Sequence, residues 1–261
     1  MKGDDNTVLT RLYPLSRLKR CMVLKIVLPV VSLLVSLASA TLAQTAPLQQ
    51  TNFGPPIKLG AFGNGKGLGT QDPQWSLFAN GNGVNLPAMA RIQTAFVAPG
   101  SPQALQIFAV AGHKHQCGVS TKVAGDAQVI TYEADVQLRS SLHQTAWQFA
   151  AGDDSAHGFV GGFNVLPDGH LQLITKGSPP QPATTVPRDV WKHFAISFDL
   201  RKQTSEIWID GQSQVTNLPF LAPAKRVAIF QFDTFAGGDD TACLANFVAH
   251  AGPPTGAPAA H

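Results

Sequence analysis

The sequence predicts an all-β protein, an antiparallel two-sheet β-sandwich of the jelly-roll kind. The clearest sign is a hairpin pattern: over residues 194–200 every second side chain is apolar, which is the period of a strand with one buried face. A polar turn at 201–205 follows, and a second strand, 206–210, ends in Asp-Gly. Short runs of this kind recur along the chain between turn signals, and no window shows a helical stripe with caps at both ends.

Each expected strand is an apolar or alternating run that stops at turn residues such as Pro99-Gly100 or Pro167-Asp168-Gly169. Before the hairpin the runs are 76–78, 91–96, 104–110, 118–123, 129–138, 145–150, 158–166 and 171–176, and after it they are 226–233 and 241–250. About ten strands at this spacing are typical of a sandwich or jelly roll.

The first 43 residues have the pattern of a secretory signal peptide. Residues 26–37 form a short apolar core, preceded by Lys25 and followed by Ala38-Ser39-Ala40, and cleavage after Ala40 or Ala43 fits the small-residue rule. The apolar run is too short to span a bilayer, so no stable membrane insertion is expected. Signal cores normally lie close to the start, which favours Met22 as the true first residue. We therefore expect a secreted or periplasmic protein.

The positive charge of the chain belongs to this leader. Residues 1–43 contain six of the 19 Lys and Arg and two of the 16 Asp and Glu, so the remainder has 13 and 14 and a formal charge of −1. Without a basic excess, the mature chain has nothing that would attract nucleic acid. Within it, 44–71 reads as an extended Gly/Pro-rich entry segment that could add an edge strand, 72–251 as the sandwich, and 252–261 as a disordered tail.

Two cysteines remain in the mature chain, Cys117 and Cys243. In an oxidising compartment an even pair most simply forms one disulfide, and closing so long a loop would stabilise the protein by about 4 to 5 kcal/mol. Spacing alone does not show that the two side chains meet, so two separate buried thiols stay the alternative.

Several motifs resemble the concanavalin A-like lectin/glucanase superfamily, and within it most closely the laminin-G-like jelly-roll domains. They are Trp75-Ser76-Leu77, the strands at 129–136 and 191–199, the segment 207–211, and Ala245-Asn246-Phe247-Val248. The resemblance covers roughly residues 75–250 and concerns mainly structural positions, so it implies a fold more strongly than a function. In such folds the last strand returns beside early strands, which favours the bridge between Cys117 and Cys243.

Glu133 and Asp135 are the candidate catalytic residues. Glycanases of this superfamily place acids on one strand face in an E-x-D-x-E pattern, because retaining hydrolysis needs two carboxyl groups about 5 Å apart. Alternation places Glu133, Asp135 and Gln137 on one face, but the third acid is replaced by an amide, which cannot exchange the proton. A solvated strand face is therefore the favoured interpretation.

Trp208 and Gln137 are the candidate ligand-binding residues. If Ile207 and Ile209 point inward, Trp208 points outward, where its indole could pack on a sugar ring while Gln137 meets hydroxyl groups. Burial of Trp208 beneath a loop or the second sheet is the favoured interpretation, since large aromatic side chains are mostly buried.

Asp239 and Asp240 are the candidate metal ligands. Related sandwich domains often bind calcium near their terminal strands, and calcium takes six to eight oxygen ligands. Acidic turns usually cap their own backbone instead, and this chain has Ala245-Asn246 where related domains have Asp-Asn. No cofactor is therefore expected to be required, with calcium as an optional one.

Together these features predict a secreted, non-catalytic protein that binds carbohydrate or another extracellular surface. A glycan-active hydrolase or lyase using Glu133 and Asp135 is the first alternative, and a structural envelope protein is the second. The sequence does not indicate an oligomeric state.

Overall fold

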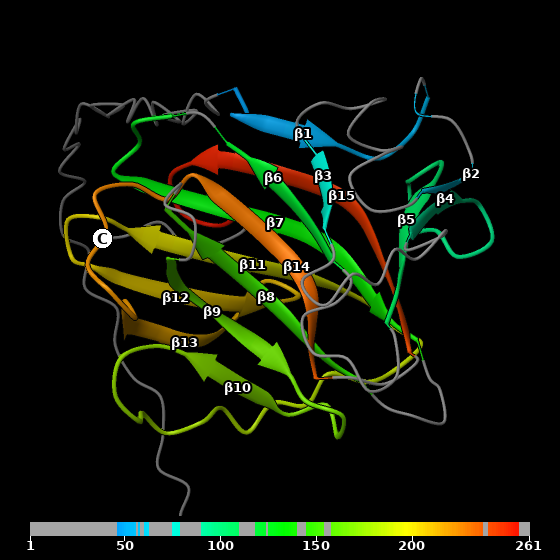
Figure 1. Cartoon of the computed structure of the whole chain (residues 1–261). Coiled ribbons are helices and arrows are strands. Elements are labelled where there is room, and N and C mark those ends of the chain that lie inside the picture. Colours follow the sequence, from blue (N-terminus) through cyan, green and yellow to red (C-terminus); the bar gives the residue numbers. More distant parts are fainter. Residues whose placement is uncertain are drawn as a thin grey trace, which may run out of the picture. The chain divides into compact units, whose positions relative to one another are not determined.

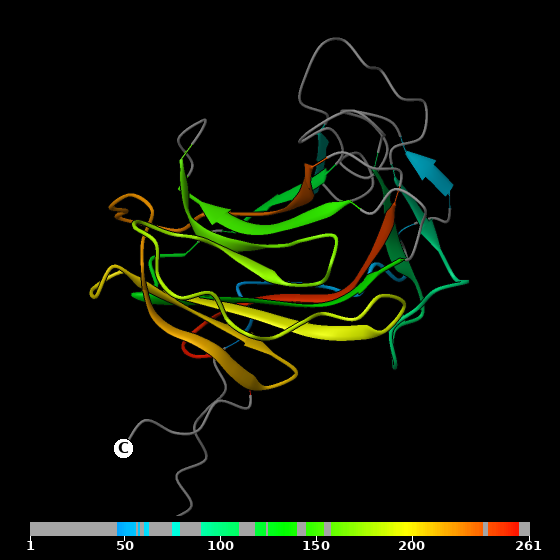
Figure 2. The ribbon, with the colours of Figure 1, turned by 90° about the horizontal axis from the view of Figure 1, so that it is seen from below.

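Two antiparallel sheets form a sandwich, which confirms the predicted fold class (Figures 1 and 2). The computed structural model describes residues 46–55, 57, 60–62, 75–78, 90–109, 118–123, 125–139, 145–153, 158–236 and 240–255. Every regular element in these ranges is a strand, and none of the residues described forms a helix able to cross a membrane.

The larger sheet has nine strands. Its order is β13 (Gln212–Pro219), β12 (Thr204–Ile209), β11 (Trp191–Asp199), β7 (Val129–Leu138), β15 (Thr241–Ala251), β5 (Ala104–Phe108), β4 (Ala90–Gln93) and β2 (Gly60–Phe62), and β1 (Gln49–Thr51) also pairs with β15. The C-terminal strand therefore lies between β7 and β5.

The smaller sheet has six strands. Its order is β10 (Leu171–Ile174), β9 (Phe159–Val165), β8 (Ala146–Gly152), β14 (Ile229–Ala236), β6 (Gly118–Lys122) and β3 (Trp75–Phe78). Figure 2 shows the two sheets as separate layers.

Aromatic side chains fill the space between the sheets. Phe230 of β14 is fully buried, and its ring centroid lies 4.7 Å from that of Phe149, 5.0 Å from Phe247 and 5.6 Å from Tyr132. These rings come from both sheets, so they join the two layers. Complete burial of one such side chain is worth about 1.5–3 kcal/mol.

The predicted hairpin is confirmed as β11 and β12, paired from Phe194 with Ile209 to Asp199 with Thr204. The Asp-Gly pair turns the chain into β13, with φ of 51° at Asp210 and 73° at Gly211. Positive φ at both central residues is the requirement of a two-residue hairpin turn, and glycine and aspartate tolerate it best.

Strands β2 and β13 are additions to the predicted set. The entry segment supplies β1, as the sequence suggested, and also β2. Strand β13 has no apolar alternation because it is an edge strand with six of its eight side chains polar or proline, so periodicity could not reveal it.

Cys243 carries a free, fully buried thiol, so the predicted disulfide with Cys117 is not supported. The residue lies within β15, between Gln137 of β7 and Gln106 of β5, where neighbouring strands enclose it. Burial raises the pKa of this thiol to about 12, so it is protonated and unreactive at neutral pH. Cys117 lies outside the described residues.

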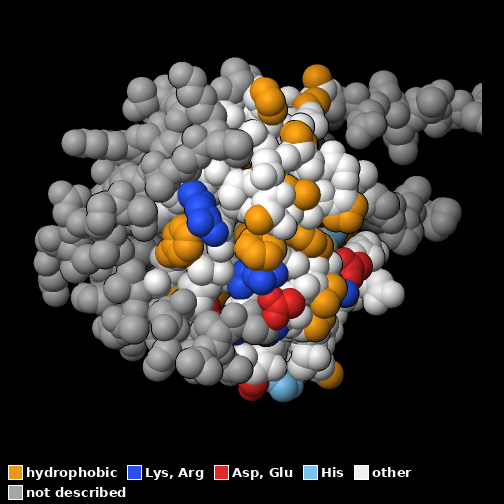
Figure 3. All heavy atoms as spheres, turned by 90° about the vertical axis from the view of Figure 1, so that its right-hand side faces the viewer, with side chains coloured by type: hydrophobic (Ala, Val, Ile, Leu, Met, Phe, Trp, Pro, Cys, Tyr) orange, Lys and Arg blue, Asp and Glu red, His pale blue; other side chains and the backbone are white. Residues whose placement is uncertain are grey.

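The surface carries no large area of one charge on the side drawn in Figure 3, where charged and hydrophobic side chains of the described residues are interspersed. This agrees with the small net charge predicted for residues 44–261.

Candidate functional site

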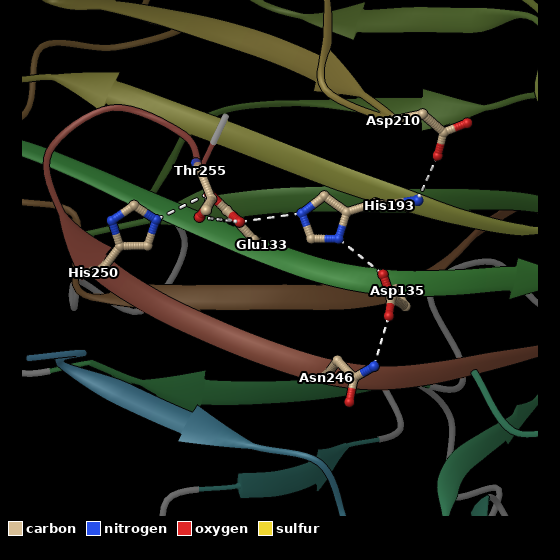
Figure 4. Close-up of polar contacts among 7 residues, drawn as sticks. All are labelled: Glu133, Asp135, His193, Asp210, Asn246, His250 and Thr255. Atoms are coloured by element: carbon tan, nitrogen blue, oxygen red, sulfur yellow. Dashed lines mark hydrogen bonds and ion pairs between the residues drawn. The ribbon is translucent and has the colours of Figure 1, made fainter. Parts of the chain in front are cut away.

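Six polar side chains meet on the outer face of the larger sheet, the face opposite the aromatic core (Figure 4). We call them the acid–histidine cluster: Glu133 and Asp135 on β7, His193 on β11, Asn246 and His250 on β15, and Thr255 beyond β15. The predicted alternation of β7 is confirmed, since Tyr132, Ala134 and Val136 belong to the core.

Glu133 is the centre of the cluster. One carboxylate oxygen lies 3.1 Å from His193 Nε2, and the other lies 3.0 Å from His250 Nε2. Thr255 adds its backbone N–H at 2.5 Å and its hydroxyl, which lies 2.9 and 2.8 Å from the two oxygens. The Glu133 side chain is 2% exposed, so these contacts replace its hydration almost completely.

Asp135 connects the cluster to both strands that lie beside β7. Its Oδ1 lies 2.8 Å from His193 Nδ1, and its Oδ2 accepts a hydrogen bond of 2.7 Å from Asn246. Asp210, in the turn after β12, accepts the backbone N–H of His193 at 3.0 Å. The imidazole of His193 therefore lies between two carboxylates.

Strand register explains why these residues meet. His193 is directly opposite Asp135 in the pairing of β11 with β7, so both side chains are on one face. On the other side of β7, a bulge in β15 between Ala245 and Val248 places Asn246 at φ 48° and lets its amide reach Asp135.

Thr255 belongs to the segment expected to be a disordered tail. The structure differs for its first part: Gly252 N–H donates to Val129 O, Gly252 O accepts the hydroxyl of Thr131, and Thr255 contacts Glu133. Composition favoured disorder because Pro, Ala and Gly bury little surface, whereas here a buried carboxylate supplies the contacts.

Hydrogen bonds within the cluster shift the pKa values of Glu133, His193 and His250. Burial alone would raise the pKa of Glu133, but hydrogen bonds from His193, His250 and Thr255 outweigh it and lower the pKa far below the ordinary 4.5. Hydrogen bonds to Asp135 and Glu133 raise the pKa of His193 from 6.5 to about 9. The hydrogen bond to Glu133 likewise raises the pKa of His250. Glu133 is therefore ionised and His193 protonated.

This arrangement does not suit acid catalysis or metal binding. A general acid needs a raised pKa and access to the substrate, and Glu133 has neither. The ring nitrogens of His193 and His250 all lie within hydrogen-bond distance of oxygen atoms. Among the residues that the structure describes, no group of three or more His, Cys, Asp or Glu could hold a metal ion.

Stability should fall as the pH rises through the pKa of His193. Because folding raises this pKa from 6.5 to about 9, its stabilisation is complete below pH 6.5 and is lost as pH passes 9. The side chain is 36% exposed, so after allowance for solvent screening we expect a loss of about 1–2 kcal/mol. Glu133 acts in the opposite direction, and its contribution declines only below its ordinary pKa of 4.5.

Denaturant unfolding at pH 6 and at pH 10 measures this loss. In the variant His193→Gln the difference between the two pH values should shrink by the share of His193 while the share of His250 remains, whereas His170→Gln, at an exposed position, should keep it. An unchanged pH dependence in His193→Gln would contradict the assignment.

The two predicted ligand-binding residues have different surroundings. Gln137 is buried, donates to Asp189 O at 3.0 Å and accepts from Arg139 at 3.3 Å, so its amide serves the protein itself. Trp208 faces away from the core, as predicted, but it is half-buried and its Nε1 is enclosed without a hydrogen-bond partner among the described residues. The role of Trp208 as a sugar contact stays a prediction.

Of the two predicted calcium ligands, only Asp240 is among the residues that the structure describes. Asp240 is fully buried, accepts the backbone N–H of Thr145, and lies 3.6 Å from Arg188 Nη1. A guanidinium already compensates this carboxylate, which makes it a poor calcium ligand. Asp239 lies outside the described residues.

Four members of the cluster were missed by sequence reasoning: His193, Asn246, His250 and Thr255. His250 gives no local signal, because its partner Glu133 is 117 positions away. One signal was available. The motifs that resemble the superfamily include parts of β11 and β15, the two strands beside β7, and these parts contain His193 and Asn246.

No family model matches the sequence, and no curated protein sequence matches it. Among solved structures, one described as "Sialidase" superposes with a TM-score of 0.56 at 10% identity, covering 80% of this chain and 19% of that one. "Cellulose induced protein, Cip1" superposes with a TM-score of 0.51 at 14% identity, covering 73% of this chain and 97% of that one. The chain thus spans about a fifth of the sialidase and nearly all of Cip1. At these identities the likeness shows a common β-sandwich fold.

Proposed function

We propose that this protein is an exported, non-catalytic carbohydrate-binding protein with a concanavalin A-like sandwich of the laminin-G-like kind. The main support is that the side chains of the acid–histidine cluster already form hydrogen bonds with one another. Glu133 and Asp135 are each held by His193, and Glu133 is ionised and covered by Thr255. Two carboxyl groups held in this way lack the free acid that glycoside hydrolysis needs.

Two further observations support a carbohydrate context. The names of the two similar structures refer to a sialidase and to cellulose. The signal-peptide pattern of residues 1–43 would bring the chain to the compartment where such glycans occur. We propose that binding needs no cofactor, and calcium is treated as a variable in the experiment.

A glycan array probed with the purified protein, with and without calcium, tests this function. We expect binding to at least one glycan class in both conditions, followed by no cleavage of the bound glycan on prolonged incubation. Product analysis by mass spectrometry detects cleavage.

Cleavage by the wild-type protein that is lost in Glu133→Gln, when that variant is still folded, would establish the hydrolase or lyase alternative. Absence of binding to every glycan on the array would contradict carbohydrate binding and favour a structural envelope role.

A further inference from the structure

A cleft of about 290 Å³ opens beside the β12–β13 hairpin, and its lining contains Asp210, which accepts the backbone N–H of His193. One wall is the connection from β10 to β11, at Thr184 and Thr185, and the other is formed by Gln212 and Gln214 of β13. Apolar lining comes from Val186 and from Ile209 of β12, which are 4% and 6% exposed. The cleft therefore combines an apolar part with polar walls.

We propose that this cleft is the carbohydrate site, and that it takes a neutral glycan of about one or two sugar units. The inference rests on the proposed function and specifies its ligand. A sugar ring presents C–H groups on its faces and hydroxyl groups around its rim. Val186 and Ile209 suit the C–H groups, while threonine hydroxyls and glutamine amides suit the rim.

The walls are already held in place. The Thr184 hydroxyl donates to Gln214 Oε1, and Gln214 Nε2 donates to Gln212 O at 2.9 Å. The first of these hydrogen bonds joins the two walls. A ligand entering such a cleft loses less free energy in ordering side chains, because they occupy defined positions beforehand.

The charges in the lining compensate each other. Lys192 Nζ lies 2.6 Å from Asp210 Oδ2, and Asp210 Oδ1 also accepts the backbone N–H of His193. Burial alone would raise the pKa of Asp210, but the hydrogen bonds from Lys192 and from the backbone N–H of His193, with the charge of Lys192, lower it. With no excess cation in the lining, an anionic sugar would gain nothing over a neutral one.

The size of the cleft limits the ligand. At about 290 Å³ it lies just below the range of about 300–1,000 Å³ for small-molecule sites. A long glycan could therefore place only a terminal unit or pair of units within it.

Titration calorimetry with neutral disaccharides, namely cellobiose, lactose and maltose, tests the inference, with sialyllactose as the charged counterpart of lactose. We expect the wild type to bind at least one neutral disaccharide. Thr185→Trp should fill the cleft from an exposed position and weaken that binding about tenfold or more. The matched control Thr216→Trp, on an exposed position of β13 outside the lining, should change it by less than about twofold.

Trp208→Ala separates this site from the outer face, because Trp208 alternates with Ile209 and points to the other side of β12. If the cleft binds the sugar, the affinity stays within about twofold of wild type, whereas the sugar contact that the sequence predicts for Trp208 would make Trp208→Ala weaken binding. Thermal unfolding verifies that each variant is folded, and Gln212→Ala, at an exposed position, replaces Thr185→Trp if that variant is not.

Unchanged binding in the folded cleft variants, loss of binding in Trp208→Ala, or tighter binding of sialyllactose than of lactose would each overturn the inference while the proposed function stands. If the wild type binds no glycan on the array, the proposed function fails and the cleft assignment fails with it.

Discussion

Glu133→Gln should lower the free energy of unfolding by about 3–5 kcal/mol, the range for removing one partner of a buried charged network. The amide keeps the size of the side chain but loses the negative charge that His193 and His250 face at 3.1 and 3.0 Å. Two raised histidine pKa values would then return toward their ordinary value, and Thr255 would donate to a neutral amide oxygen instead of a carboxylate.

Chemical denaturation at pH 6, where both histidines are protonated in the wild type, measures the change. Glu206→Gln is the matched control, because Glu206 lies on β12 outside the cluster, and we expect a change below about 0.5 kcal/mol. Equal stability of Glu133→Gln and wild type would show that the cluster does not stabilise the fold.

Arg188→Met should lower the free energy of unfolding by about 3 kcal/mol, since it removes a cation from beside a buried anion. Arg188 Nη1 lies 3.6 Å from Asp240 Oδ2, and the two side chains are 13% and 0% exposed. Arg188 also donates to Thr145 O at 3.0 Å, so the same guanidinium links the connection before β11 to the start of β8.

Arg201→Met is the matched control, because Arg201 is 70% exposed and lies 3.9 Å from Asp199, an arrangement worth about 0–1 kcal/mol. Both variants are measured with and without calcium. Recovery of Arg188→Met by calcium, together with calcium binding by the wild type, would contradict the ion-pair assignment and restore Asp240 as a metal ligand.

The sequence predicted the strands better than the site. Strand β7 begins and ends where expected, at Val129 and Leu138, because it opens on a run of β-branched and aromatic residues and keeps an apolar side chain at every second position to its end. The shared face of Glu133 and Asp135 followed from the two-residue period alone. Both predictions depend only on local sequence.

The contacts of those acids depend on which strands lie beside β7, and local sequence does not contain this information. His193 and His250 come from opposite neighbours, 60 and 117 positions from Glu133. The bulge that turns Asn246 toward Asp135 contains no glycine that would indicate it in the sequence. The disulfide was predicted wrongly for the same reason, since pairing of cysteines depends on distance in space and not on their number.

The central place of β15 in the larger sheet has a consequence for how the molecule is made. Strands β7 and β5 cannot be joined until the chain has been synthesised as far as Ala251, and Thr255 reaches Glu133 across 122 positions. Closing such distant contacts is slow compared with forming neighbouring hairpins such as β11 with β12. The hairpin can therefore form early, while the larger sheet is completed late and the edges of β5 and β7 stay exposed until β15 arrives.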